Sequence, residues 1–427
     1  KKRVILFIVA LQGFLGPLSS SIYIPAIAQV RQSFNTTSTM INLTISLYMF
    51  TMGIAPLIWA TLSERNGRRA IYVVSTLVYV VSTVSCGLSR STTPFIIARI
   101  FQSVGASASQ AVGAGTITDI FYVHERGNSM GLFLLGPLIG PVVGPIVGGY
   151  INEFLEWRYI FWVLAVVGSC IFFLILFFVP ETSSVMLKRR QLKNNSQEAT
   201  QKESMLKSMV RPIQYLTKPA VVFAAIPYSV GYGFMYFMIS SLPSQLILHY
   251  QFSSSQIGLM YIANGAGNAL GALISGKLSD VTLNREKDPE RRTPEMRLPS
   301  MWLGIVLFPL GQLIYGWSFE MEVHIAVGIV GLLFLGLGVG ILQTPSNTYI
   351  VDAYQTHSAS AMSAANLMRC IFAGSTPLLA PTLLSKVGNG WSMTILAAIS
   401  LLTGISVFLV QRYGKYWRSK DLGLDTN

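Results

Sequence analysis

The sequence predicts an all-α membrane protein in which twelve transmembrane helices form two pseudo-symmetric six-helix bundles. Of its 427 residues, 52% are hydrophobic and only 11% are charged, whereas about a quarter of the residues of a soluble domain are charged. Nearly uncharged runs recur along the chain, and about twenty apolar residues in a helix span the hydrocarbon layer of a bilayer. The two halves also repeat short polar patterns at corresponding places. These observations exclude an ordinary soluble domain.

The uncharged runs have the length that a membrane-spanning helix requires. They cover residues 4–26, 40–63, 70–89, 94–118, 128–151, 159–180, 220–246, 255–276, 299–318, 323–350, 358–384 and 391–411. A polar segment that begins at Glu181 and includes Lys188 divides the first six runs from the last six. We therefore expect an N-terminal bundle at 1–180, a cytoplasmic linker at 181–218, a C-terminal bundle at 219–412 and a cytoplasmic tail at 413–427.

Lysine and arginine gather in alternate loops, and basic residues are retained on the cytoplasmic side of a membrane. Of the 31 lysines and arginines, most lie in one set of alternate loops, which we assign to the cytoplasm. Two lie inside runs, Arg99 and Arg369, and four lie in the loops on the opposite side, Arg31, Arg90, Arg158 and Lys386. Both termini are therefore expected in the cytoplasm. The net charge of +13 follows from the same rule, so it does not indicate nucleic-acid binding. Asn35 begins a glycosylation acceptor pattern in the first outer loop, and its use is left open.

The two halves echo one another at the ends of corresponding runs. Leu62-Ser63-Glu64 closes the second run and Leu278-Ser279-Asp280 closes the eighth. Asp119 ends the fourth run and Asp352 ends the tenth, and each is followed by a histidine five residues later. Such echoes predict two bundles related by a parallel internal repeat.

The run at 128–151 combines glycine and proline in a pattern that a soluble helix would not tolerate. Glycines recur every four residues from Gly136 to Gly148, which forms a smooth ridge that lets a neighbouring helix approach closely. Pro137, Pro141 and Pro145 each follow one of these glycines, and they weaken the backbone hydrogen bonding of the helix at successive turns. We expect this run to be a bending element, formed by Gly140, Pro141, Gly144, Pro145, Gly148 and Gly149. The alternative is a tightly packed span with no moving part.

From Gly140 to Gly149 the run resembles the antiporter signature in the fifth span of the major facilitator superfamily, G-x-x-x-G-P-x-x-G-G, and it matches at each fixed position. The resemblance implies two bundles that rock about a central cavity near the middle of the membrane.

The loop from Ala60 to Arg69 resembles the family motif G-x-L-A-D-R-x-G-R-K, with Ala60, Ser63 and Glu64 replacing the first glycine, the alanine and the aspartate. Charged pairs at a membrane boundary can break and re-form as bundles tilt. We expect a gating latch formed by Glu64, Arg65, Gly67, Arg68 and, in the second half, Asp280. The alternative is that the basic residues serve only as an orientation signal.

Arg99 lies inside the fourth run, and an arginine within the membrane is a functional candidate because its burial is costly. Arg99, Gln102 and Gly105 resemble the family motif R-x-x-Q-G-x-G, with Ser103 in place of a glycine. In relatives this arginine is linked to proton transfer, so the resemblance implies proton coupling at Arg99. The alternative is a structural arginine bonded to carbonyl groups. Asp119 and Asp352 are candidates for proton coupling or for latch partners.

Polar side chains inside the runs are the candidates for lining a substrate cavity. They are Gln12, Ser20, Tyr48, Gln102, Tyr228, Tyr232, Tyr236, Asn264, Asn268, Gln343, Asn347, Asn366 and Arg369. The three tyrosines from 228 to 236 recur at four-residue steps and so share one helix stripe. No Asp or Glu lies near the middle of any run, whereas two arginines do. The interior therefore favours anionic, zwitterionic or neutral polar substrates.

The stretch from Pro294 to Pro299 (P-E-M-R-L-P), followed by Tyr315-Gly316-Trp317, resembles a segment of the fungal twelve-span drug:proton antiporters, and the chain is similar to the fungal drug and organic-acid antiporters over nearly its whole length. This resemblance implies a monomeric, proton-coupled exporter of small organic molecules in the plasma membrane or the vacuolar membrane. Two alternatives remain: a proton symporter or uniporter that imports a small polar solute, and a transporter-like receptor that does not transport. The sequence has no P-loop or catalytic triad, and Cys86, Cys170 and Cys370 are far apart. We therefore expect no enzyme activity, no metal and no cofactor beyond a proton gradient.

Overall fold

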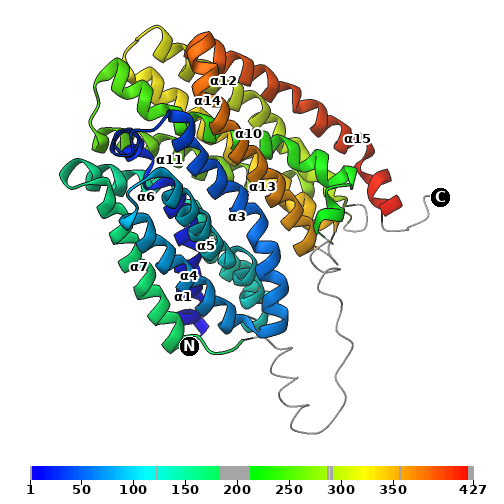
Figure 1. Cartoon of the computed structure of the whole chain (residues 1–427). Coiled ribbons are helices and arrows are strands. Elements are labelled where there is room, and N and C mark those ends of the chain that lie inside the picture. The colour runs from blue at the N-terminus through cyan, green and yellow to red at the C-terminus, as the bar shows by residue number, and fades with distance from the viewer. Residues whose placement is uncertain are drawn as a thin grey trace. The chain divides into compact units, whose positions relative to one another are not determined.

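The computed structural model describes residues 2–121, 123–182, 212–285, 288, 292–354 and 358–421, and these residues form helices and connecting turns without a strand. The predicted all-α class is confirmed. The chain divides into two compact units, Lys1–Val210 and Arg211–Asn427, which Figure 1 shows in order along the chain. The division falls inside the predicted linker, most of which lies outside the described residues.

Unit 1 is built from six long helices and a short outer segment. Its elements are α1 (Lys2–Ser21), the 3-10 turn η1 (Ile24–Ala26), α2 (Ile27–Ser33), α3 (Ser38–Asn66), α4 (Arg68–Leu88), α5 (Thr92–Ile120), α6 (Val123–Phe154) and α7 (Trp157–Phe178). Within this unit α1 lies beside α6, α5 packs against both α3 and α4, and α4 also contacts α7. The Thr37 hydroxyl accepts a hydrogen bond from the backbone of Met40 and so caps the start of α3.

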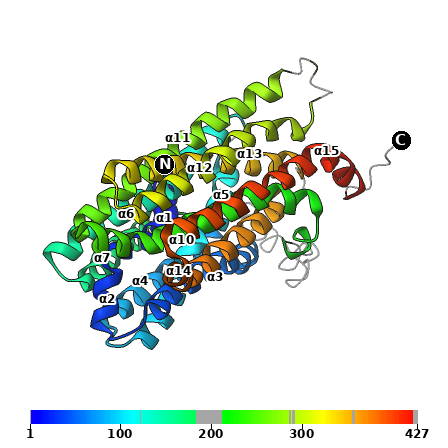
Figure 2. The ribbon, with the colours of Figure 1, turned by 90° about the horizontal axis from the view of Figure 1, so that it is seen from above.

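Unit 2 repeats the plan with its own set of helices. Its elements are α10 (Pro219–Tyr250), α11 (Ser254–Asn284), the 3-10 helix η3 (Pro294–Ser300), α12 (Met301–Glu320), α13 (Ile325–Ala353), α14 (Ser358–Leu402) and α15 (Gly404–Asp421). Helix α13 packs against both α11 and α12, and α10 lies against α14. Figure 2 shows these helices from above. A reciprocal pair of side-chain bonds between Ser253 and Gln256 starts α11.

Among the described residues, nine helical segments are long and apolar enough to cross a membrane, whereas the sequence predicted twelve spans. Helices α5 and α6 are present but are not among the nine: α5 carries Arg99, Gln102 and Gln110 among its apolar residues, and several side chains of α6 lie outside the described part of the chain. The predicted spans at 358–384 and 391–411 form one segment, Ser358–Asp421. That segment is kinked at Gly388, which has φ +78°, and turns again at Thr403.

The glycine ridge of α6 faces α1. A Cβ atom on Gly140 would lie 2.9 Å from the backbone nitrogen of Leu18, and one on Gly148 would overlap the backbone oxygen of Ile22. Backbone atoms cannot move aside as a flexible side chain can, so only glycine permits this approach. The three prolines that follow the ridge are accommodated within one continuous helix, Val123–Phe154. The glycine-proline run therefore forms a close backbone-to-backbone contact.

We expect Gly148→Ala to lower the thermal unfolding temperature of the detergent-solubilised protein, because the added methyl group must push α1 and α6 apart. Overpacking of this kind costs about 1–3 kcal/mol. Gly231→Ala in α10 is the matched control, since its Cβ would lie 3.5 Å from its nearest neighbour, the Leu342 side chain. The control should unfold at the wild-type temperature or above it, because alanine favours a helix over glycine. Equal unfolding temperatures for the two variants would contradict the assigned contact.

Candidate functional site

Arg99 on α5 is fully buried inside unit 1 and is held between two aromatic rings. Its guanidinium carbon lies 4.3 Å from the ring centre of Tyr48 on α3 and 4.5 Å from that of Tyr23, in the turn after α1. Its Nη1 donates hydrogen bonds to the backbone oxygen of Ser19 at 3.0 Å and to Oε1 of Gln102 at 2.7 Å. Cation–π contacts of this kind stabilise a cation away from water.

A chain of side-chain hydrogen bonds extends this centre to α4. Gln102 donates from Nε2 to the Thr83 hydroxyl at 2.9 Å, and the hydroxyls of Ser19 and Tyr79 are 2.7 Å apart. The Tyr48 hydroxyl donates to the backbone oxygen of Gly16 on α1 at 2.9 Å. The structure thus brings together three predicted residues, Arg99, Gln102 and Tyr48, and joins four helices around them.

No carboxylate of the described residues forms an ion pair with Arg99. Its Nε and Nη2 atoms are buried and have no hydrogen-bond partner in the described part of the chain. A buried charge without an opposite charge is costly, so the charge of Arg99 is compensated only by dipoles and aromatic rings among these residues.

Unit 2 holds a second arginine on aromatic rings. The guanidinium carbon of Arg369 on α14 lies 4.4 Å from the ring centre of Tyr232 and 5.9 Å from that of Tyr228 on α10, and Nη2 donates to Asn366 one turn earlier. Tyr236 continues the tyrosine row, with its ring centre 5.1 Å from that of Tyr232. The structure therefore clusters five of the predicted cavity residues. Unlike Arg99, Arg369 is only half-buried.

Two predicted residues of α1 are engaged within unit 1. Gln12 is buried and donates from Nε2 to the Thr76 hydroxyl of α4 at 2.9 Å. Ser20 donates to the backbone oxygen of Pro17, three residues earlier in its own helix, at 2.7 Å. A hydroxyl that bonds to its own helix was the alternative to a cavity position.

The remaining predicted cavity residues lie on α11 and α13. Asn264 donates to the backbone oxygen of Leu332 at 3.4 Å, where α11 and α13 meet. Asn268, one turn further along α11, is half-buried, and its Oδ1 has no partner among the described residues. Gln343 and Asn347 are half-buried, one turn apart on α13. None of these four contacts Arg369 in the described contacts.

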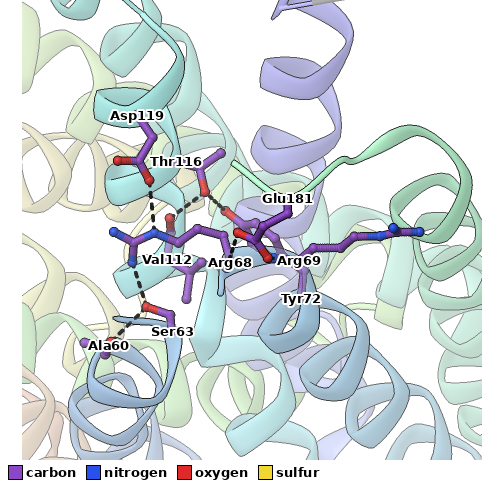
Figure 3. A network of polar contacts seen from close by, with 9 residues as sticks. All are labelled: Ala60, Ser63, Arg68, Arg69, Tyr72, Val112, Thr116, Asp119 and Glu181. Carbon is purple, nitrogen blue, oxygen red and sulfur yellow. Dashed lines mark hydrogen bonds and ion pairs between the residues drawn. The ribbon is translucent and has the colours of Figure 1, made fainter. Parts of the chain in front are cut away.

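A charge network joins the ends of four segments in unit 1 (Figure 3). Arg68, the first residue of α4, pairs from Nε with Oδ2 of Asp119 at 3.2 Å and donates from Nη1 to the Ser63 hydroxyl at 2.6 Å. Its backbone N–H donates to Oε1 of Glu181, beyond α7, at 2.9 Å. Gly67 makes room for this carboxylate, because its φ of +91° suits glycine and a Cβ there would overlap Glu181.

Glu181 is a residue that the sequence analysis assigned to the linker rather than to the site. The sequence signal that could have indicated Glu181 was its position directly after a span. A carboxylate at the end of one helix can lie near the N-terminus of another, where it is stabilising. Of the other predicted latch residues, Arg65 lies in the exposed last turn of α3. The side chain of Glu64 lies outside the described part of the chain.

Unit 2 repeats this network with different residues. Arg297, in η3 before α12, pairs from Nε with Oδ2 of Asp352 at 2.6 Å and from Nη1 with Oδ1 of Asp280 at 2.9 Å. Arg297 thus corresponds to Arg68, and Asp352 to Asp119. The sequence analysis did not assign Arg297 to the latch, although it follows the echo of residues 62–64 at 278–280.

Within unit 2, a further set of polar contacts joins the end of α15 to the start of α10 and the end of α13. Lys218 pairs from Nζ with Oδ1 of Asp421 at 2.8 Å, and the Tyr354 hydroxyl donates to Oδ2 of the same carboxylate at 2.8 Å. Burial raises the pKa of the Tyr354 phenol, and the neighbouring Asp421 carboxylate raises this pKa further. The phenol therefore stays protonated as a donor at neutral pH. Helix α15 extends through the first residues of the predicted tail.

Comparisons with known proteins agree with this architecture. The sequence model of the Major Facilitator Superfamily matches residues 9–374. The MFS-type transporter penM of Penicillium rubens is 35% identical over 410 residues, which cover 92% of this chain and 80% of that protein. The efflux pump radE of Floropilus chiversii is 32% identical over 424 residues, which cover 95% of this chain and 79% of that protein.

Solved structures show the same fold at low sequence identity. A bacterial homolog of the human lysosomal transporter Spinster, in an inward-facing conformation, has a TM-score of 0.73 at 15% identity and covers 96% of this chain and 97% of its own. The xylose transporter XylE from E. coli has a TM-score of 0.69 at 15% identity, over 96% of this chain and 97% of its own. The two-unit helical fold, the family match and the transporter relatives together show that the chain belongs to the Major Facilitator Superfamily of membrane transporters.

Proposed function

We propose that this transporter exports small organic molecules by proton antiport and alternating access, acting as a monomer in the plasma membrane with both termini in the cytoplasm. Export is supported by a relative that is named an efflux pump and by the glycine-proline run of α6, which matches the family's antiporter signature. The loops rich in lysine and arginine are all expected on the same side of the membrane, and this supports placing both termini in the cytoplasm.

The observation that carries the substrate class is Arg369 of unit 2, held on aromatic rings without a carboxylate of the described residues paired to it. At Arg369 the tyrosine row of α10 offers ring faces beside a half-buried guanidinium. A guanidinium binds a carboxylate through charge-assisted hydrogen bonds, and tyrosine rings pack against an apolar or aromatic body. We therefore assign organic anions and zwitterions with an apolar body as substrates, with Gln343 and Asn347 as further polar contacts.

For proton coupling, the proposed residues are Arg99, Asp119 and Asp352. Each aspartate ends a helix and forms an ion pair with an arginine that starts another segment, Arg68 or Arg297. Protonation of either carboxylate removes its charge and so weakens the pair that joins the two helix ends. These charge pairs are also the proposed gating latch, because they can break and re-form as the bundles move.

Arg369→Gln should impair transport of organic anions in proteoliposomes under an imposed proton gradient. Loss of a charge-assisted hydrogen bond, worth about 1.5–3 kcal/mol, predicts at least about a tenfold rise in KM. Lys386→Gln removes an exposed positive charge from the same helix and should leave KM unchanged. The screen should include organic acids, amino acids and permanently cationic drugs. Transport of permanent cations alone would refute the substrate class. Solute movement in the same direction as the protons would refute antiport. Binding of these compounds without any flux would refute transport.

The latch predicts that Arg68→Gln and Asp119→Asn act as one unit. Each single variant should lower the unfolding temperature and slow proton-driven exchange, because each leaves a partly buried charge without its partner. The double variant should be no worse than the more damaging single variant. Arg68→Gln combined with Asp352→Asn is the matched control, since these residues have different partners in different units and their effects on unfolding should add. Additive effects for Arg68 and Asp119 would contradict the latch.

A further inference from the structure

The sequence holds three acceptor sequences for N-linked glycosylation, each of the form Asn-x-Ser or Asn-x-Thr. They begin at Asn35, Asn42 and Asn194. Asn194 belongs to the predicted cytoplasmic linker and lies outside the described residues. Asn42 is buried, with 5% of its surface exposed, in the second turn of α3 and inside a candidate membrane span. Asn35 is therefore the acceptor that the fold leaves accessible.

Asn35 lies exposed in the turn between α2 and α3. Its φ is +47°, and the backbone N–H groups of Asn35 and Thr36 donate to the carbonyls of Gln32 and Arg31. Asparagine and glycine commonly end a helix in this way. These bonds involve only backbone atoms, and the side-chain amide of Asn35 forms no hydrogen bond to another described residue. The amide that would receive a glycan is therefore not needed for the turn.

Open space adjoins Asn35. A hollow of about 440 Å³ is lined by Ala28, Gln29, Arg31, Gln32, Asn35 and Thr36. A second hollow, of about 410 Å³, shares Gln29 and Gln32 with the first. Amide and guanidinium groups of this lining can form hydrogen bonds with sugar hydroxyls. A bulky polar group attached to Asn35 thus has room and meets a polar surface.

Helix α2 extends the first candidate span beyond the length that the membrane requires. That segment, Lys2–Ser33, has 32 residues, whereas about 20 residues of helix cross the hydrocarbon layer. Near its start, Val4 and Phe7 are exposed, as suits contact with lipid. The exposed side chains of α2 are all polar: Gln29, Arg31, Gln32 and Ser33. The turn that holds Asn35 therefore lies at an aqueous surface.

We propose that Asn35 carries an N-linked oligosaccharide at the outer end of unit 1. The proposal rests on the proposed orientation, in which both termini are cytoplasmic and the turn after α2 is on the opposite side. The donor is a lipid-linked pyrophosphate oligosaccharide. The bond from C1 of the first sugar to the pyrophosphate oxygen breaks, a bond from C1 to Nδ2 of Asn35 forms, and one Nδ2 proton is released as the lipid pyrophosphate leaves.

The test uses the full-length protein produced in eukaryotic cells and digested with a peptide N-glycosidase, which removes the glycan and converts its asparagine to aspartate. We expect faster migration of the digested protein on a gel, and mass spectrometry should find aspartate at position 35 after digestion. Unchanged migration, together with an unmodified asparagine at position 35, would overturn the proposal.

Variants chosen to keep the turn intact locate the glycan. Asn35→Gly removes the acceptor but suits the positive φ, so the mobility shift should be lost completely while the protein folds. Thr37 completes the acceptor sequence, and its hydroxyl also caps α3. Thr37→Asp keeps a good capping residue but should lose the shift, whereas Thr37→Ser keeps both the cap and the acceptor and should retain it. A shift that survives Asn35→Gly or Thr37→Asp would overturn the assignment to Asn35.

Two further variants separate failure of glycosylation from failure of the orientation. Asn194→Gln should retain the shift, and its loss in this variant would place the linker outside the cytoplasm and overturn both proposals. Asn35→Cys should react with a membrane-impermeant maleimide in intact cells, above the background of the wild type. Labelling of Asn35→Cys when the wild type has no glycan would overturn glycosylation but leave the orientation and export standing. Failure of export in proteoliposomes would leave a glycan at Asn35 standing.

Discussion

The placement of a guanidinium inside each helical unit, fully buried at Arg99 and half-buried at Arg369, is the constraint on which the rest of the structure depends. Hydrocarbon offers no water to a charged side chain, so the protein must surround Arg99 with its own dipoles and aromatic rings. This requirement draws the end of α1, together with α3 and α4, to α5 through the contacts of Tyr48, Gln102 and Ser19. Unit 2 meets the same constraint differently: in the described part of that unit, α10 and α14 place rings and an amide beside Arg369.

The two kinds of helix contact in the structure have complementary mechanical properties. Ion pairs such as Arg68 with Asp119 fix the ends of helices, because each pair has one favourable geometry and a high cost of separation when partly buried. The ridge of α6 against α1 is smooth by contrast, since its glycines place backbone on backbone. Side chains still cross this contact: the Phe133 ring packs against Gly13, and the Ser21 hydroxyl lies against Gly144 and donates to the Gly140 oxygen. Both contacts lie inside unit 1, so they determine how the helices of that unit hold together.

The sequence predicted features that arise from local patterns, and it missed those that depend on distant segments meeting. Composition and run length placed the helices, and the four-residue spacing of glycine predicted the ridge of α6. Gln12 was expected in a cavity, yet it bonds to Thr76 of α4, because the sequence does not show which face of α1 meets a neighbour. Glu181 and Arg297 were not assigned to the charge networks, since their partners lie on helices far away in the chain. The internal repeat could have indicated Arg297, and so could the stretch from Pro294 to Pro299 that resembles the fungal antiporters.

The placement of the charged groups gives the two units different parts in the proposed mechanism. In unit 1 the ion-paired Asp119 and the buried Arg99 lie on the same helix, α5, twenty residues apart, or about 30 Å at 1.5 Å per residue. A helix is stiff over this distance, so a change at the ion pair can shift α5 and with it the environment of Arg99. In unit 2 the ion-paired aspartate is on α13 and the arginine on α14, so no single helix connects them. In unit 1 the proposed proton linkage can therefore run along one helix, whereas in unit 2 Asp352 acts on its own ion pair with Arg297. Unit 2, with its more accessible arginine and tyrosine row, is better suited to binding the substrate.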